Sequence, residues 1–411
     1  MRKKIQVHQL RLGMFVDELC GSWLDHPFWK SAFVLSDPKQ VLQLTTSPVK
    51  EVWIDISKGL DVEEEAAQVQ VVDGVEMSPP PVATQAPKLP TGAGAVPTVS
   101  MVDEVARAGR ICAKARGAMK TMFQDARMGK ALDAEHCLPL VDDITQSVRR
   151  NPGAIVSLAR LKTSDDYTYM HSVAVCALMV SLSRQLGLSD DDTREAGLAG
   201  LLHDLGKSAM PLEVLNKPGK LSDAEFKVIR SHPEEGHRML LEGRGVSQVP
   251  LDVCLHHHEK VNGSGYPHGL RGEQMSVFVK MGAVCDVYDA ITSNRPYKAG
   301  WDPAESILHM VQWGKEGHFD DAVLQAFIRS IGIYPTGSLV KLRSGRLGVV
   351  VEQGAQSLLS PVVKAFFSTK SNQRIVPELL ALGTPRCSDQ IVSRESPAAW
   401  KFADLNELWR T

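Results

Sequence analysis

Residues 196–207 read AGLAGLLHDLGK, an apolar run of small and branched side chains that leads directly into a histidine and an aspartate. Ser189 and three aspartates stand ahead of this run, and both residue types are favoured where a helix begins. The run therefore predicts a helix. It also raises the question of why two polar residues, His203 and Asp204, follow so apolar a segment.

The helical character of this run extends over residues 136–336. Further helix-start signals occur there, because Ser222 with Glu225 forms a capping box and Asp302 precedes Pro303. Alternation of β-branched and polar residues is scarce in the same range. The sequence therefore predicts an α-helical bundle over residues 136–336.

The two ends of the chain differ from the bundle. Residues 1–75 mix short β-rich runs with turn residues, as a small α/β or β module would. Residues 76–100 are rich in proline and alanine and predict a flexible linker, because they cannot offset the entropy of folding by burial. Residues 101–135 are rich in helix formers and predict a connecting helix that docks on the bundle or pairs with a second copy. Residues 337–411 predict a short β-rich extension, so the whole chain is expected to be mainly α.

Composition narrows the expected partners and compartment. The 411 residues include 46 basic and 48 acidic side chains, so no overall charge attracts a nucleic acid polymer or anionic lipid. The seven cysteines are scattered and form no CxxC pair, which argues against a disulfide framework or a thiolate zinc site. A reducing cytoplasm is the expected location. The N-terminus lacks an apolar run behind its basic residues, and no long apolar run follows, so neither a signal peptide nor a membrane span is expected.

Histidines are concentrated in the bundle, where eight of the thirteen fall between His171 and His268. Positions with histidine or aspartate recur there at intervals of 25 to 32 residues, about one helix and its return, so each helix can deliver a ligand to one point. These residues are His171, His203, Asp204, His232, His257, His258 and Asp286. Imidazole and carboxylate without thiolate favour iron, manganese or another divalent ion over structural zinc. On a helix, His203 and Asp204 diverge by about 100°, which favours two ions, an arrangement that clamps a phosphoryl group.

Three motifs follow one another in this region, HDLGK, HHEKVNGSGYP and DVYDAITSNRPYK. With them, residues 150–335 closely resemble the HD-GYP family of cyclic di-GMP phosphodiesterases, a branch of the HD metal-dependent phosphohydrolases. The stretch LRLGMFVDELCGSWLDHPF near the N-terminus is similar to a small domain of unknown function that is often fused ahead of HD-GYP domains. The resemblance implies an HD-type bundle that hydrolyses cyclic di-GMP to linear pGpG or GMP in bacterial signalling.

The resemblance also implies roles for individual residues. By position, the recurring histidines and aspartates above are the metal ligands, with Asp204 bridging the ions and serving catalysis beside Lys207. Arg295 and Lys298 are implied to contact the substrate phosphates. The loop residues implied to bind substrate are Gly265, Tyr266 and Pro267. In some family members a glutamate four residues before the first ligand histidine helps to hold a third metal. Because Tyr167 stands there, two divalent ions are expected.

Several neighbours of the motifs have more than one interpretation. The family register leaves His256 outside the ligand set. Glu259 is predicted to orient a ligand histidine by hydrogen bonding, the alternative being a solvated carboxylate. Asp289 lies one turn beyond Asp286, where it either serves the site or anchors Thr292 or nearby backbone. Three further histidines are expected to have ordinary surface or core roles: His237, His268 and His309.

The glycines of NGSGYPHGL are expected to let the backbone approach a bulky dinucleotide, although part of this loop can be structural. Their spacing does not fit the dinucleotide-binding fingerprint of a Rossmann fold. The predicted reaction is hydrolysis of a 3′–5′ phosphodiester of cyclic di-GMP, with two divalent ions activating water and polarising the phosphate. The N-terminal module and linker are expected to position or regulate this reaction.

Two alternatives remain. One is an HD phosphohydrolase that acts on another nucleotide, because the same metal site permits other phosphoesters. The other is a non-catalytic scaffold that responds to cyclic di-GMP and binds diguanylate cyclases or other signalling proteins, which the intact ligand set disfavours. A homodimer is compatible with either function.

Overall fold

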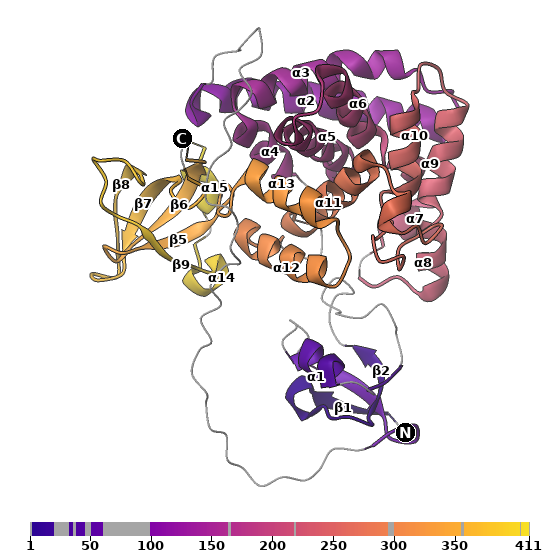
Figure 1. The fold of residues 1–411 in the computed structure, drawn as a ribbon, viewed down its shortest axis with the longest axis horizontal. Coiled ribbons are helices and arrows are strands. Elements are labelled where there is room, and N and C mark those ends of the chain that lie inside the picture. The colour runs from indigo at the N-terminus through magenta and orange to yellow at the C-terminus, as the bar shows by residue number, and fades with distance from the viewer. Residues whose placement is uncertain are drawn as a thin grey trace. The chain divides into compact units, whose positions relative to one another are not determined.

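The computed structural model describes residues 2–19, 33–35, 38–45, 51–60, 99–162, 166–217, 219–294, 300–354, 357–402 and 404–410. The chain forms two compact units, one built on an N-terminal sheet and one on the helices and a C-terminal sheet (Figure 1). Nearly all of the predicted linker, residues 76–100, lies outside the described residues. Among the residues described, none of the helices combines the length and hydrophobicity that crossing a bilayer requires.

The N-terminal unit is a small α/β module, as predicted. Its antiparallel sheet has the order β1-β4-β2-β3. The last strand in the sequence, β4, therefore lies between β1 and β2 and pairs with both. Leu44 of the helix and Val52 and Ile54 of the last strand are fully buried in one apolar cluster. The elements are β1 (Arg2–Gln6), η1 (Val7–Gln9), β2 (Phe15–Leu19), β3 (Phe33–Val34), α1 (Pro38–Thr45) and β4 (Glu51–Asp55).

The larger unit consists mainly of helices, as predicted. They are α2 (Met101–Arg127), α3 (Leu138–Arg150), α4 (Pro152–Arg160), α5 (Tyr167–Leu186), α6 (Asp190–Leu202), α7 (Leu212–Leu215), α8 (Asp223–Ile229), α9 (His232–Leu241), α10 (Gln248–His256), α11 (Val277–Thr292), α12 (Pro303–Lys315) and α13 (Asp321–Ile331), with 3₁₀ turns η3 (Ala134–Cys137), η5 (Leu205–Ala209) and η6 (Gly272–Gln274). Ser189 caps α6 by accepting a hydrogen bond from the amide of Asp192, and Asp302 caps α12 in the same way. The sequence signals for these two helix starts are confirmed.

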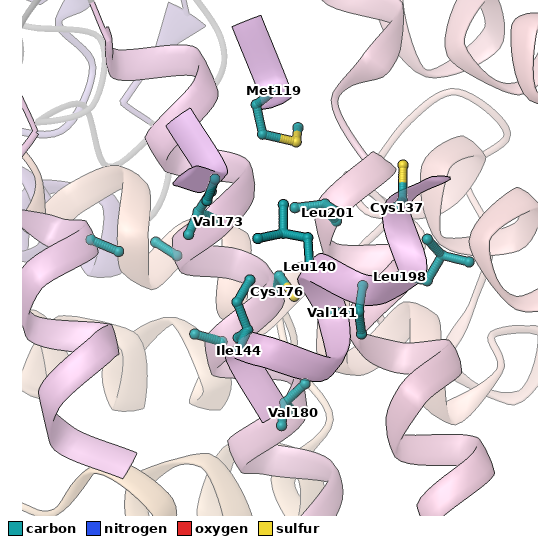
Figure 2. Close-up of a cluster of buried hydrophobic side chains, with 14 of the residues drawn as sticks. Met119, Cys137, Leu140, Val141, Ile144, Val173, Cys176, Val180, Leu198 and Leu201 are labelled. Carbon is teal, nitrogen blue, oxygen red and sulfur yellow. The ribbon is translucent and has the colours of Figure 1, made fainter. Parts of the chain in front are cut away.

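Helix α5 lies at the centre of the bundle. Its residues 170–183 are all buried, because α2, α4, α6, α11 and α13 pack around it. Figure 2 shows Val173, Cys176 and Val180 of α5 among apolar side chains of α3 and α6. A helix covered on every side needs apolar residues around its circumference, which explains why α5 has no polar face. The first polar residue that α5 carries into this interior is His171, which is buried.

Two glycines of the AGLAGLL run bring α6 close to α5. A Cβ atom at Gly200 would lie 2.9 Å from Cα of Cys176, and one at Gly197 would lie 2.9 Å from Cγ2 of Val180. Larger side chains would therefore push the two helices apart. This close packing delivers the end of α6, and the histidine and aspartate that follow it, to the middle of the bundle.

Helix α2 docks on the bundle of its own chain. Ala108, Ala115, Met119 and Phe123 are buried in the same apolar cluster as α3, α5 and α6. Glu104 is also fully buried, and its carboxylate accepts hydrogen bonds from the Arg150 guanidinium at 2.7 and 2.8 Å. An ion pair with such two-point geometry holds the first turns of α2 against α3.

A five-stranded antiparallel sheet in the order β8-β7-β6-β5-β9 follows the bundle. The elements are β5 (Leu339–Leu342), β6 (Arg346–Glu352), β7 (Val362–Ser368), β8 (Gln373–Ala381), β9 (Ile391–Arg394), α14 (Pro397–Trp400) and α15 (Leu405–Leu408). The runs SLVKLRSGRLGVVVE and PVVKAFFS form β5, β6 and β7, as predicted. Strands β8 and β9 form the two edges and were not predicted, because most β8 side chains are exposed and show no buried alternation.

Candidate metal centre

The predicted metal ligands converge in the interior of the bundle. His171 comes from α5, His232 is the first residue of α9, and Asp286 lies on α11. The remaining ligands come from the turns that follow α6 and α10: His203, Asp204, His257 and His258. Together they form three overlapping groups in which the potential ligand atoms lie within 4.8 Å of one another. Residues separated by more than a hundred positions in the chain thus share one centre.

The turn after α6 corrects one part of the sequence interpretation. His203 and Asp204 were expected to lie on one helix, but α6 ends at Leu202 and Asp204 leads into the 3₁₀ turn η5, which contains Lys207. A Cβ atom at Gly206 of this turn would lie 1.9 Å from the carbonyl oxygen of His232. Because only glycine permits this approach, the tertiary contact with α9 determines where the helix ends.

Asp204 occupies the middle of the centre. Its Oδ1 lies 3.2 Å from Nε2 of His232 and 3.8 Å from Nε2 of His257. Its Oδ2 lies 3.4 Å from Nε2 of both His171 and His203. Each oxygen of one carboxylate therefore faces a different pair of imidazoles, which is the arrangement that a ligand bridging two ions requires.

The second aspartate, Asp286, shares one pair of histidines with Asp204 and also faces His258. Asp286 Oδ1 lies 2.9 Å from Nε2 of His171 and 3.8 Å from Nε2 of His203. Its Oδ2 lies 3.6 Å from Nδ1 of His258. The ligands thus divide into a first set of His171, His203 and Asp286 and a second set of His232, His257 and His258, with Asp204 between them.

Backbone carbonyls orient three of the ligand histidines. In each case Nδ1 lies within hydrogen-bond distance of a carbonyl oxygen in the preceding turn, so an Nδ1–H donor leaves the Nε2 lone pair facing the centre. These pairs are His203 with Gly200 at 2.8 Å, His232 with Ile229 at 2.7 Å, and His257 with Cys254 at 3.0 Å. The local fold therefore selects the tautomer that can bind a metal.

His171 is oriented by a carboxylate. Its Nδ1 lies 2.5 Å from Oδ2 of Asp289, and the same oxygen accepts a hydrogen bond from the ammonium of Lys162. Burial acts to raise the pKa of Asp289, but the Lys162 charge and the bond to His171 hold this pKa below its ordinary value. Of the two interpretations of Asp289, this contact favours the one in which it serves the site, while its Oδ1 accepts a hydrogen bond from the Ser293 hydroxyl at 3.2 Å. Lys162 was missed, because nothing in the local sequence distinguishes it from a surface lysine.

Neighbouring groups stabilise the ionised form of the buried Asp204 carboxylate. Burial acts to raise the pKa of Asp204, but the charge of Lys207 and the neighbouring imidazoles of His203 and His232 hold it well below its ordinary value. Lys207 contacts Oδ2 of Asp204 directly. Burial also lowers the pKa of His258, to about 3, so this ring is neutral and able to act as a ligand at physiological pH.

The donor set fits divalent metal ions. Oδ1 of Asp204 is buried and has no hydrogen-bond partner among the residues described, which is costly unless a cation satisfies it. The surrounding donors are imidazole nitrogens and carboxylate oxygens, which suit iron, manganese and similar ions. These observations support metal binding by the chain's own residues.

The loop that follows the paired histidines corrects one further prediction, that for Glu259. Glu259 does not orient a ligand histidine, because its carboxylate accepts hydrogen bonds from the amides of His268 at 2.7 Å and Leu270 at 3.1 Å. It therefore holds the loop closed. A Cβ atom at Gly265 would lie 2.4 Å from Cα of Glu259, so this glycine serves the packing of the loop on its own backbone.

Tyr266 lies against the second set of ligands. Its ring stacks on that of His258, with centroids 4.7 Å apart and planes at 24°. The guanidinium of Arg230 lies over the same ring, 4.3 Å from its centroid. Pro267 follows Tyr266 in this loop, whereas Arg295 and Lys298 lie outside the residues that the structure describes.

Two residues beside the ligands also agree with the sequence interpretation. His256 is bonded to Asp252 at 2.9 Å and to His268 at 3.1 Å, so it stays outside the ligand set. The ring of Tyr167 stacks on His171, with centroids 5.9 Å apart and planes at 9°. This chain therefore has the phenol of Tyr167 at the position where some family members are expected to have a glutamate that helps to hold a third metal.

Comparisons with known proteins agree with this architecture. The family described as "HD domain" matches residues 148–323, and "Domain of unknown function (DUF3391)" matches residues 2–137, a range that includes α2. The protein named cyclic di-GMP phosphodiesterase PA4108 from Pseudomonas aeruginosa is 54% identical over 413 residues, covering 100% of this chain and 96% of that protein.

Two other relatives match part of the chain. The Xanthomonas campestris protein named cyclic di-GMP phosphodiesterase response regulator RpfG is 39% identical over 150 residues, 36% of this chain and 39% of that protein. The Vibrio cholerae protein named 3′3′-cGAMP-specific phosphodiesterase 1 is 33% identical over 181 residues, 43% of this chain and 42% of that protein.

A helical bundle whose histidines and aspartates converge from separate segments on a buried centre defines the class of HD-domain proteins. The chain belongs to the HD-GYP family within this class, with the DUF3391 domain ahead of its HD domain.

Proposed function

We propose that this protein is a metal-dependent phosphodiesterase that hydrolyses cyclic di-GMP to linear pGpG, GMP or both and so lowers the level of a bacterial second messenger. The observation that carries the proposal is the position of Asp204, whose two oxygens face two different pairs of histidines. The extent of the similarity to a cyclic di-GMP phosphodiesterase, 54% identity over the full chain, supports the choice of substrate.

The two sets of ligands are proposed to hold one divalent ion each, iron or manganese, with Asp204 shared between them. Two such ions supply Lewis-acid polarisation of the phosphate and lower the pKa of water toward neutrality. The chain supplies the positions of these ions, because backbone carbonyls and Asp289 hold the ligand rings in place. Apolar packing of α5 and α6 makes the support rigid.

Positive side chains are proposed to bind the phosphate that is cleaved. The Lys207 side chain is 22% exposed beside the fully buried Asp204, so its ammonium can reach both the centre and a substrate oxygen. Arg295 and Lys298 are proposed as further phosphate contacts on the strength of the NRPYK motif. Gly265, Tyr266 and Pro267 are proposed to line the substrate side of the loop. Fixed cations of this kind stabilise charge that develops on the phosphate.

A related cyclic dinucleotide is the second candidate substrate. One relative is named for 3′3′-cGAMP, and the metal centre acts on a phosphodiester that both dinucleotides contain. The ligand set carries no group that distinguishes guanine from adenine. We therefore propose cyclic di-GMP as the preferred substrate and 3′3′-cGAMP as its closest competitor. Diguanylate cyclases or a second copy of the chain remain proposed partners, and the reducing cytoplasm remains the proposed compartment.

One pair of neighbouring histidines tests the proposal sharply. His257 and His256 are adjacent, yet only His257 faces Asp204, while His256 is bonded to Asp252. His257→Ala should lose bound metal and turnover of cyclic di-GMP, and His256→Ala should keep both. Metal content of anaerobically purified protein and chromatography of the products from cyclic di-GMP and 3′3′-cGAMP provide the measurements.

Asp204→Ala extends the same test to the shared carboxylate. Turnover should be abolished while the circular dichroism spectrum stays that of the wild type, because the apolar core around α5 is untouched. Full activity of Asp204→Ala at saturating metal would refute the proposed two-ion centre. Equal effects of His256→Ala and His257→Ala would refute the assignment of the ligands.

A further inference from the structure

Arg230 lies at the edge of the metal centre without being one of its ligands. It follows the last residue of α8 and stands two positions before the ligand His232. Its guanidinium lies 4.3 Å from the centroid of the Tyr266 ring, and the His258 ring stacks on Tyr266 at 4.7 Å. Two groups this close to one ring centroid cannot share a face. Tyr266 therefore separates Arg230 from the ligand His258 by a single aromatic layer.

The hydrogen-bond donors of Arg230 face no acceptor among the residues that the structure describes. Arg230 is exposed, and within the described part of the chain no carboxylate or carbonyl oxygen pairs with its guanidinium. Arg238 on α9 is a clear contrast, because its guanidinium binds Glu235 at 3.1 Å and Glu242 at 2.8 Å. Stacking on Tyr266 and Phe226 fixes the position of Arg230 while leaving its planar set of N–H donors available.

We propose that Arg230 binds the phosphate of a cyclic dinucleotide that is not being cleaved. This inference rests on the proposed function. A cyclic dinucleotide carries two phosphates on one ring, and the metal centre with Lys207 can take only one of them. The other phosphate must lie beside the centre, where Arg230 offers a cation beyond the Tyr266 ring.

The chemistry of the side chain fits this role. A guanidinium matches phosphate oxygens with two parallel hydrogen bonds, which a lysine ammonium cannot reproduce. Because stacking already restricts the side chain, less conformational entropy is lost when the ligand binds. The same donors also match O6 and N7 of guanine, so recognition of the base is the outcome that the experiment must separate.

The experiment compares wild type with Arg230→Ala, Arg230→Lys and the control Arg238→Ala, all loaded with the same metal. Hydrolysis of bis(p-nitrophenyl) phosphate, which has a single phosphodiester, reports the metal centre alone. Inhibition of this hydrolysis by cyclic di-GMP and by cyclic di-AMP reports binding of two-phosphate ligands with different bases. Turnover of cyclic di-GMP is measured in parallel, so that failure of the proposed function is seen separately in the wild type.

Arg230→Ala should weaken inhibition by both cyclic dinucleotides about ten- to a hundredfold and lower kcat/KM for cyclic di-GMP by a similar factor. Its rate on bis(p-nitrophenyl) phosphate should stay within about twofold of wild type, and Arg238→Ala should match wild type throughout. In Arg230→Lys, inhibition by the cyclic dinucleotides and kcat/KM for cyclic di-GMP should lie between the values of wild type and Arg230→Ala.

Three outcomes would overturn the inference. Unchanged inhibition in Arg230→Ala would exclude a phosphate contact. A loss confined to cyclic di-GMP would assign Arg230 to the guanine base. Equal loss on bis(p-nitrophenyl) phosphate, together with a lower melting temperature, would make Arg230 a support for Tyr266.

Discussion

Asp289 Oδ2 lies 2.5 Å from Nδ1 of His171, and this contact determines which nitrogen of His171 faces the metal centre. The same oxygen binds the ammonium of Lys162, whose side chain is fully buried. A buried cation, a carboxylate and a ligand imidazole thus form one continuous chain. Outer contacts of this kind set both the orientation and the basicity of a metal ligand.

Removal of this support should weaken metal binding without removing a ligand. The double variant Lys162→Met with Asp289→Asn removes both buried charges together, so the fold should be retained. Its affinity for metal should fall about 10- to 100-fold, and turnover should recover at high metal concentration. Metal titration followed by activity provides the measurement.

Asp289→Asn alone offers the comparison. It removes a charged partner of the buried Lys162, so it should be less stable than the double variant. If the single and double variants unfold at the same denaturant concentration and bind metal like wild type, Asp289 has no role in the centre.

Acidification should release the metal of the first ligand set before that of the second. Burial acts to lower the pKa of His171, but Asp286 and Asp289 outweigh this effect and raise it. Burial holds the pKa of His257 well below its ordinary value. A raised pKa means that protonation begins at higher pH, and a protonated imidazole cannot bind a metal. His171 should therefore be the first ligand lost as pH falls.

Metal content measured after equilibration at a series of pH values tests this order. An intermediate with half of the bound metal should appear as the pH falls through the raised pKa of His171, while the far-ultraviolet circular dichroism spectrum is unchanged. Loss of all metal in one step that coincides with unfolding would show that the two sets do not differ in proton affinity.

Lys207 should contribute to turnover more than to metal binding. It contacts Asp204, and its charge lowers the pKa of that carboxylate. Lys207→Met should lower kcat for cyclic di-GMP about a hundredfold, because a fixed positive charge near the phosphate is lost, and bound metal should stay at the wild-type level. Lys227→Met removes an exposed lysine of α8 and should have no effect. Parallel loss of metal and activity in Lys207→Met would instead assign Lys207 to the support of Asp204.

The ligands could be predicted from sequence because their chemistry is unusual for a helical core and recurs at helix-length intervals. Lys162 could not, because its partner Asp289 is 127 positions away and only the fold brings them together. The end of α6 at Leu202 was mispredicted for a similar reason, since local helix propensity contains no information about the carbonyl of His232 that meets Gly206. Local patterns thus identified the residues that converge on the candidate centre, while the contacts that orient them depend on tertiary packing.

The edge strands of the C-terminal sheet show the same limit. Strands β6 and β7 each contain five consecutive buried residues, which are apolar apart from Lys364 of β7 and which the sequence displays as strand-like runs. Strand β8 is held by backbone pairing with β7, and Val376 within it is 87% exposed. Since backbone hydrogen bonds do not depend on side-chain type, no periodic pattern marks this strand.

Gly206→Ala should disrupt the metal centre by a purely steric route, and Gly109→Ala provides its control. An added Cβ atom at Gly206 would lie 1.9 Å from the His232 carbonyl oxygen and 2.5 Å from the Gly236 amide nitrogen. Because both neighbours are backbone atoms, η5 must move away from α9, which separates Asp204 from His232. The free energy of unfolding should fall by about 1–3 kcal/mol, and bound metal should be lost.

At Gly109, within α2, an added Cβ atom meets nothing within 4 Å, so alanine should stabilise the protein by roughly 0.5–1 kcal/mol. Urea unfolding in the presence of a chelator and metal analysis without it measure the two effects, and wild-type stability with full metal in Gly206→Ala would contradict the packing of η5 on α9.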